Sequence, residues 1–150
     1  MNSMKELNRF VKAQDMPYVG YKQALFEIRA GQKQSHWIWY VFPQIHGMGQ
    51  SWASKEYAIQ SLEEAKAYLG HEILGPRLRE ITRELLNHSG EDVNTLMGSG
   101  IDVKKLRSCM TLFDLVSPDD VFSEVLKVFF GGERDSRTLK TVSAEKESAE

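Results

Sequence analysis

The sequence of 150 residues has one cysteine, no long apolar run and almost no net charge. The lone Cys109 excludes an intrachain disulfide framework and a multi-cysteine zinc site. No stretch approaches the roughly 18 apolar residues that a membrane helix needs, and the N-terminus lacks the apolar run of a signal peptide. With 19 Lys and Arg against 21 Asp and Glu, the net charge of −2 disfavours a nucleic-acid binder. We therefore expect a cytoplasmic protein with neither a membrane nor a nucleic acid as partner.

Helix caps and helical spacing dominate the rest of the chain. Ser61 with Glu64 forms a capping box before an apolar stripe, and Asp15 with Pro17 indicates another helix start. The apolar segment 37–42 fits a buried strand or a buried helix, but a lone strand has nothing to pair with. We predict an all-α domain over residues 1–142, with about seven short helices crossing irregularly. The small and charged segment 143–150 is predicted to be a disordered tail.

A first candidate site lies in residues 35–51. Two tryptophans and a phenylalanine there could form the walls of a pocket for a flat ring, and two glycines allow close approach of the backbone. A glutamine and a serine could orient the ligand, and a histidine could transfer protons. The alternative is a tryptophan-rich core with an ordinary turn. The residues concerned are His36, Trp37, Trp39, Phe42, Gln44, Gly47, Gly49 and Ser51.

A second candidate site lies in residues 98–113. A Gly-Ser-Gly turn at 98–100 leads into a helix start, where free N–H groups attract anions. Lys104, Ser108 and Thr111 lie on one face of that helix, with Lys105 beside them, and together they could hold a phosphate or a carboxylate. The alternative is a solvated basic face.

Glu27 is the candidate general base, because the following turn could fold it back toward Ser35 and His36. Its alternative is an ordinary surface carboxylate. The four histidines lack metal-ligand spacing, so we expect no metal and no cofactor. Cys109 lies on the apolar side of its helix and is expected to be buried.

Long motifs closely resemble a bacterial family of domains of unknown function whose members often carry the label calpastatin. The resemblance extends from about Leu7 to Leu139, and it implies a mainly helical fold with no established activity. Glu72, Ile73 and Cys109 depart from the family pattern. The motifs are Ser35-His36-Trp37-x-Trp39-x-x-Phe42-Pro43-Gln44 and Asp102-x-x-Lys105-Leu106-x-Ser108-x-Met110-Thr111-Leu112-Phe113.

The calpastatin label and a weaker resemblance to the NADAR proteins imply two different functions. Inhibitory calpastatin segments are disordered and repetitive, whereas three Trp, seven Phe and the absence of a repeat predict a chain that folds alone. We therefore reject calpain inhibition. The order of the aromatic segment and the Lys-x-x-Ser-x-Met helix is also loosely similar to the NADAR proteins, which implies ADP-ribose or N-glycoside chemistry.

Our main hypothesis is a binding protein or enzyme for a nucleotide-like or ADP-ribose-like small molecule. Residues 35–51 and 98–113 would face each other across a shared hollow, and Glu27 or His36 would catalyse metal-independent cleavage of an N-glycoside. The alternative is a non-catalytic interaction module, in which the aromatic segment is partly exposed and receives a partner protein.

Overall fold

The computed structural model describes residues 3–149, and within that range the chain forms ten helices and no strand. The all-α prediction is confirmed, but about seven helices was too few. Two of the additional helices have five residues each, too short for an apolar period to be recognised. The helices are α1 (Ser3–Gln14), α2 (Tyr21–Arg29), α3 (Ile38–Val41), α4 (Trp52–Glu56), α5 (Leu62–Gly70), α6 (Leu74–Leu86), α7 (Val93–Met97), α8 (Gly100–Val116), α9 (Val121–Phe130) and α10 (Ser136–Ala149).

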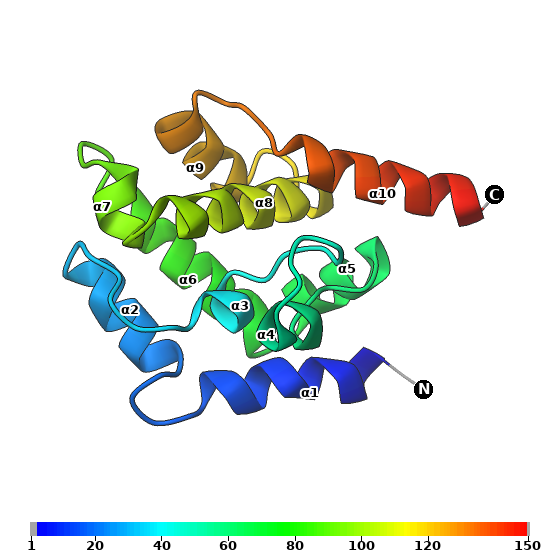
Figure 1. Cartoon of the computed structure of the whole chain (residues 1–150), viewed down its shortest axis with the longest axis horizontal. Helices are drawn as coiled ribbons and strands as arrows, with labels where there is room; N and C mark the ends of the chain where they lie inside the picture. Colours follow the sequence, from blue (N-terminus) through cyan, green and yellow to red (C-terminus); the bar gives the residue numbers. More distant parts are fainter. Residues whose placement is uncertain (1–2, 150) are drawn as a thin grey trace.

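Helix α8 is the central helix of the molecule, and it packs against α5, α7, α9 and α10 (Figure 1). Its second half is buried on all sides, so an amphipathic stripe gives way to the continuous run 108–114. Cys109 lies in this run, as expected, and burial raises the pKa of its thiol. A buried, protonated thiol is a packing residue.

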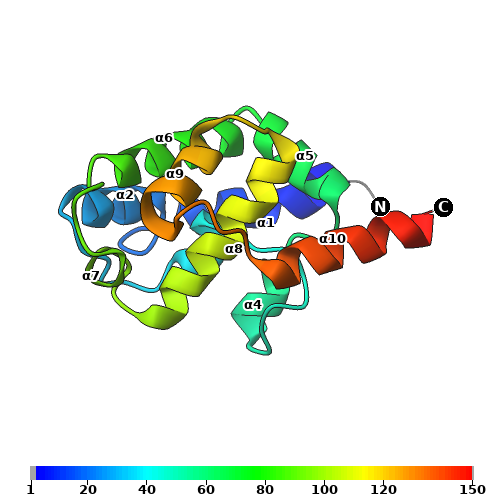
Figure 2. The same cartoon turned by 90° about the horizontal axis from the view of Figure 1, so that it is seen from above.

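Segment 37–42 forms a short buried helix, α3, and not a strand. The chain beyond it makes an isolated parallel bridge between Ile45 and Ile59. This bridge fixes the beginning of the glycine-containing loop, whose far side carries α4 at the edge of the molecule (Figure 2).

Helix α2 begins at Tyr21 with Gly20 at its cap position, five residues later than the Asp15 cap predicted from the sequence. The intervening turn is tight, because a Cβ on Gly20 would lie 2.3 Å from the carbonyl oxygen of Gln14. Asp15 instead forms an ion pair of 3.0 Å with Arg77 of α6. A tertiary contact has therefore replaced the local cap.

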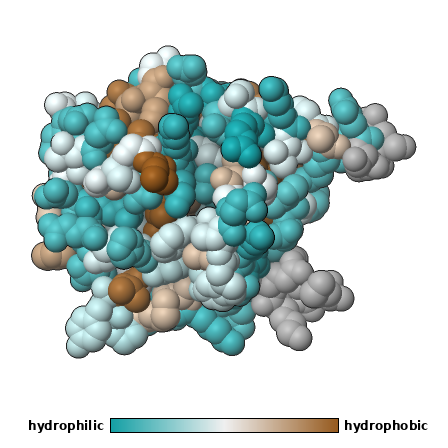
Figure 3. Space-filling model, viewed as in Figure 1, coloured by the Kyte–Doolittle hydropathy of each residue, from teal (hydrophilic) through white to brown (hydrophobic). Residues whose placement is uncertain are grey.

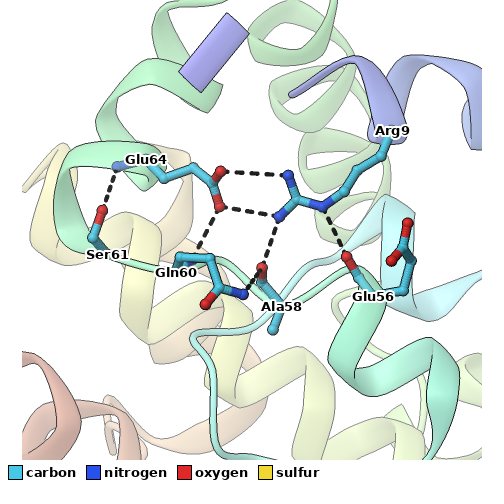
Figure 4. A network of polar contacts seen from close by, with 6 residues as sticks. All are labelled: Arg9, Glu56, Ala58, Gln60, Ser61 and Glu64. Atoms are coloured by element: carbon cyan, nitrogen blue, oxygen red, sulfur yellow. Dashed lines mark hydrogen bonds and ion pairs between the residues drawn. The ribbon is translucent and has the colours of Figure 1, made fainter. Parts of the chain in front are cut away.

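The predicted Ser61 cap of α5 is confirmed, but the Glu64 side chain reaches back to Gln60 and not to Ser61, and both residues belong to a larger network (Figure 4). The Glu64 N–H donates to the Ser61 hydroxyl at 3.0 Å, and the Glu64 carboxylate accepts from the Gln60 N–H. Arg9 of α1 reaches the same carboxylate at 3.1 Å and also donates to the carbonyl of Ala58. The network joins the first helix to the start of α5.

The last helix continues to Ala149 and includes most of the segment expected to be a disordered tail. Glu145 links it to the body of the protein, because its carboxylate accepts the Leu62 N–H at 2.9 Å. A small and charged composition is typical both of an exposed helix and of a disordered end. In Figure 1, α10 extends past the other helices.

The molecular surface is mainly polar on the face shown in Figure 3, with small hydrophobic areas between hydrophilic residues. Across residues 3–149, no helix combines the length and the apolar character needed to cross a membrane.

Candidate anion-binding site

A hollow of about 380 Å³ lies where the loop after α3, the first half of α8 and the start of α10 come together. Its volume is within the range of small-molecule sites. The two sequence stretches expected to face each other therefore do meet. The lining residues are Gln44, Met48, Ile101, Lys104, Lys105, Arg107, Ser108, Asp135, Ser136 and Arg137.

Positive charge dominates this lining, which holds four cationic side chains and one carboxylate. Lys104 and Lys105 form no ion pair with any described residue. Arg107 approaches Glu133 at 4.0 Å, at the limit for an ion pair, and that glutamate is largely exposed. Like charges held together in a hollow raise the local concentration of anions, although the whole chain has a net charge of −2.

The single carboxylate that lines the hollow, Asp135, is occupied in capping α10. It accepts both the N–H and the hydroxyl of Thr138, at 2.9 and 2.6 Å. The Asp135 N–H in turn donates to the Thr111 hydroxyl at 2.9 Å, and Ser108 hydrogen-bonds to Thr138. Thr111 and Ser108 thus position the start of α10 on α8, and in this way they hold the two helices that line the hollow together.

The loop side of the hollow is held in place by α10. Arg137 donates to the carbonyl of Gly47 at 3.0 Å, and Gly47 has the left-handed φ of 87° that favours glycine. Lys105 lies 5.1 Å from the centre of the Trp39 ring, on which it stacks as a cation–π pair. Trp39 of the aromatic segment therefore positions the Lys105 side chain at the hollow.

Two buried donors near the hollow have no acceptor among the described residues. They are Nε of Arg107, which lines the hollow, and Nε1 of Trp39. Trp39 faces a small void that shares Gln44 and Met48 with the hollow. Buried donors are almost always paired with protein, water or a ligand, so each of these two N–H groups is open to a water or ligand acceptor.

Several residues expected at the site lie elsewhere. Trp37 and Phe42 have no exposed surface and belong to the core, so neither can form the wall of a pocket. Gly49 and Ser51 shape the turn into α4, where Ser51 caps the helix and a Cβ on Gly49 would lie 2.6 Å from the Ser54 hydroxyl. His36 is exposed and lines none of the cavities described here.

Glu27 also lies outside the hollow, buried beneath the turn that precedes α3. Its Oε1 accepts the N–H groups of Gln34 and Ser35 and Nε1 of Trp37, at 2.7, 2.8 and 2.9 Å. Its Oε2 accepts the Ser35 hydroxyl and the Gln23 amide. Burial acts to raise the pKa of Glu27, but these hydrogen bonds outweigh it and lower the pKa to about 2. A carboxylate so held is a weak base and a strong structural anchor.

The Gly-Ser-Gly turn does not line the hollow either. Ser99 caps α8 by accepting the Asp102 N–H at 3.1 Å, and Gly98 ends α7 with a φ of 86°. Asp102 pairs with the buried Lys33 at 2.9 Å, so it does not compete for an anion in the hollow. The turn joins α8 to the segment before α3, and the first cationic residue of the hollow, Lys104, lies one helical turn further along α8.

Six lining residues were not among the candidates named from the sequence: Met48, Ile101, Arg107, Asp135, Ser136 and Arg137. Arg137 follows Asp135, a residue type that often caps a helix, and a helix start is a place where free N–H groups attract anions. That signal was available, but it did not show that this helix start would lie on α8.

Comparison with known proteins gives one family and one solved structure. A family model described as protein of unknown function (DUF1810) matches residues 4–142. The chain is 42% identical to the conserved hypothetical protein Rv1873 from Mycobacterium tuberculosis, whose crystal structure it matches with a TM-score of 0.87, over 92% of this chain and 96% of that one. No curated protein matches.

Proposed function

Since this chain belongs to the DUF1810 family, whose description assigns no activity, we propose from the geometry of the site that it binds a phosphate-bearing small molecule of nucleotide type. The observation that carries the proposal is the group of four cationic side chains around a hollow whose one carboxylate is committed to a helix cap. Ile101 and Met48 on the lining offer apolar surface to a base or a sugar.

Binding is better supported than cleavage of an N-glycoside. Glu27 and His36, the acid–base candidates, lie outside the hollow, and Asp135 is hydrogen-bonded to Thr138. General acid–base catalysis needs a titrating group within hydrogen-bond reach of the ligand. The ADP-ribose-like ligands suggested by the NADAR likeness suit the basic hollow as ligands, with no need for turnover.

The test is a thermal-shift and calorimetric comparison of AMP, ADP and ADP-ribose with adenosine. A phosphate compound at about 100 times its Kd should stabilise the fold by about 2.7 kcal/mol, and adenosine should not. Lys104→Gln and Lys105→Gln should each weaken binding by about tenfold, the loss of one charge-assisted contact.

The matched control is Lys12→Gln, which removes an exposed lysine of α1 that lines none of the described cavities. This variant should bind as the wild type does. Equal melting temperatures with phosphate compounds and with adenosine would contradict the proposal.

A second candidate function is a protein-interaction module, and it is favoured by the surface formed by the turn between α1 and α2 and the adjoining part of α2. Tyr18 of the turn is 88% exposed and Phe26 of α2 is 67% exposed, and both line a cavity of about 660 Å³. Tyr18 has a φ of 67°, an unfavourable conformation for a tyrosine that contributes no packing to the fold. Exposed apolar patches of this kind mark interaction sites. This surface is not the aromatic segment 37–42, which the sequence suggested as the surface for a partner protein and which is mostly buried.

This candidate is tested by comparing proteins captured from an extract of the source cells by three baits. A partner retained by the wild type and by Lys104→Gln, but lost with Tyr18→Asn, would support it. Asparagine tolerates the left-handed conformation, so the variant should fold at least as well as the wild type. Retention of the same proteins by all three baits would contradict it.

A further inference from the structure

We infer that the ligand of this hollow carries two linked phosphates, one held by α8 and the other by the beginning of α10. The inference rests on the proposed function and makes its ligand more specific. Its basis is that the cationic groups come from two separate helices that face each other across one cavity: Lys104, Lys105 and Arg107 from α8, and Arg137 from α10.

The charge of the lining fits a diphosphate better than a monophosphate. Four cationic residues and the one carboxylate among the lining residues leave a net charge of +3. A phosphate monoester carries about −1.5 to −2 at neutral pH. One such group would leave positive charge unmatched, and a second, linked phosphate brings the ligand close to neutralising the hollow.

Hydrogen-bond donors are also available on both sides. On α8, Arg107 Nε is buried without an acceptor among the described residues. On α10, Asp135 satisfies the N–H of Thr138, and its carbonyl accepts the N–H of Leu139. The N–H groups of Ser136 and Arg137, in the first turn, have no intrahelical partner, because every helix start leaves such groups free. Each wall can therefore bind one phosphate by charge and by hydrogen bonds.

The two walls are fixed relative to each other before a ligand binds. Ser108 and Thr138 hydrogen-bond at 2.9 Å, and the Thr111 hydroxyl accepts the Asp135 N–H at 2.9 Å. Arg137 also bonds to the loop at Gly47. A ligand that bridges the walls therefore gains from both without the cost of ordering them, which is the advantage of a preorganised site.

The experiment measures the binding of inorganic phosphate and of pyrophosphate by calorimetry at one salt concentration. The wild type should bind pyrophosphate at least about tenfold more tightly than phosphate. Arg137→Gln should remove most of that difference and leave the affinity for phosphate nearly unchanged, since the α8 wall is intact. Lys104→Gln should weaken both.

The matched control is Lys140→Gln, which removes an exposed lysine of α10 outside the hollow and should change neither affinity. Phosphate binding with no preference for pyrophosphate, or a preference that survives Arg137→Gln, would overturn the two-phosphate inference alone. Failure of phosphate, pyrophosphate, AMP and ADP to bind would overturn the proposed function with it.

Discussion

At the scale of single residues, Glu27 shows how one buried carboxylate organises a turn. It accepts five hydrogen bonds from Gln23, Gln34, Ser35 and Trp37, and these contacts join α2 to the segment before α3. An ionised acceptor makes stronger hydrogen bonds than a neutral one. Glu27 was a candidate general base because the following turn could fold back over it. The turn does fold back, and its hydrogen bonds to Glu27 give the carboxylate a structural role.

The effect on stability should depend on pH. The folded-state pKa of about 2 lies below the usual 4.5 of a free glutamate, so Glu27 stabilises the fold above pH 4.5 and loses that contribution as the pH falls toward 2. Glu27→Gln should therefore lower the free energy of unfolding by about 3 kcal/mol at pH 7, and by progressively less from pH 4.5 downward. Urea denaturation at a series of pH values measures this difference.

The control for that measurement is Glu72→Gln, at an exposed glutamate between α5 and α6. It should change the unfolding free energy by less than about 0.5 kcal/mol. A Glu27→Gln protein as stable as the wild type at pH 7 would show that the hydrogen bonds to Glu27 do not anchor the turn.

At the scale of secondary structure, the junction of α5 and α6 depends on a close approach of two backbones. Gly75, in the first turn of α6, is buried, and a Cβ there would lie 2.1 Å from the carbonyl oxygen of Leu69. Gly70, at the end of α5, has nothing within 4 Å of the same position. Neither glycine has a left-handed φ, so the two positions differ in the room available for a side chain and not in backbone strain.

This pair gives a matched test of packing. Gly75→Ala should destabilise the fold by about 3 kcal/mol, because the new methyl group forces the two helices apart. Gly70→Ala should instead stabilise it by roughly 0.5 kcal/mol, because alanine restricts the unfolded chain. Chemical denaturation of both variants measures the two effects, and a fall of similar size in both would contradict the steric explanation.

At the scale of the whole molecule, the two candidate surfaces lie on different parts of the helical frame. Helices α8 and α10 lie apart from the turn between α1 and α2 (Figure 1). The basic hollow is built on α8 and α10, whereas Tyr18 of that turn lines its cavity together with Arg77 of α6. The cavities have no lining residue in common. Variants in one surface can therefore serve as controls for the other, which is how the capture experiment uses Lys104→Gln.

Much of the fold follows from local signals in the sequence, and less of the site does. The Ser61 cap of α5 and the burial of Cys109 follow from local spacing and composition. The start of α2 does not, because the pairing of Asp15 with Arg77 links residues far apart in the chain. Of the residues expected to bind the ligand, Gln44, Lys105 and Ser108 line the hollow. Trp37 and Phe42 do not, since composition alone cannot distinguish an aromatic wall from an aromatic core.

The sequence by itself determined the helical class, the start of α5 and the two stretches that carry unusual side chains, because caps and apolar periods act over a few residues. The tertiary structure alone decided that Arg137 would join Lys104 and Lys105, and that Glu27 would be enclosed away from them. Those outcomes depend on how helices cross and pack. A crossing is set by the shape and volume of many side chains at once, and no short segment contains that information.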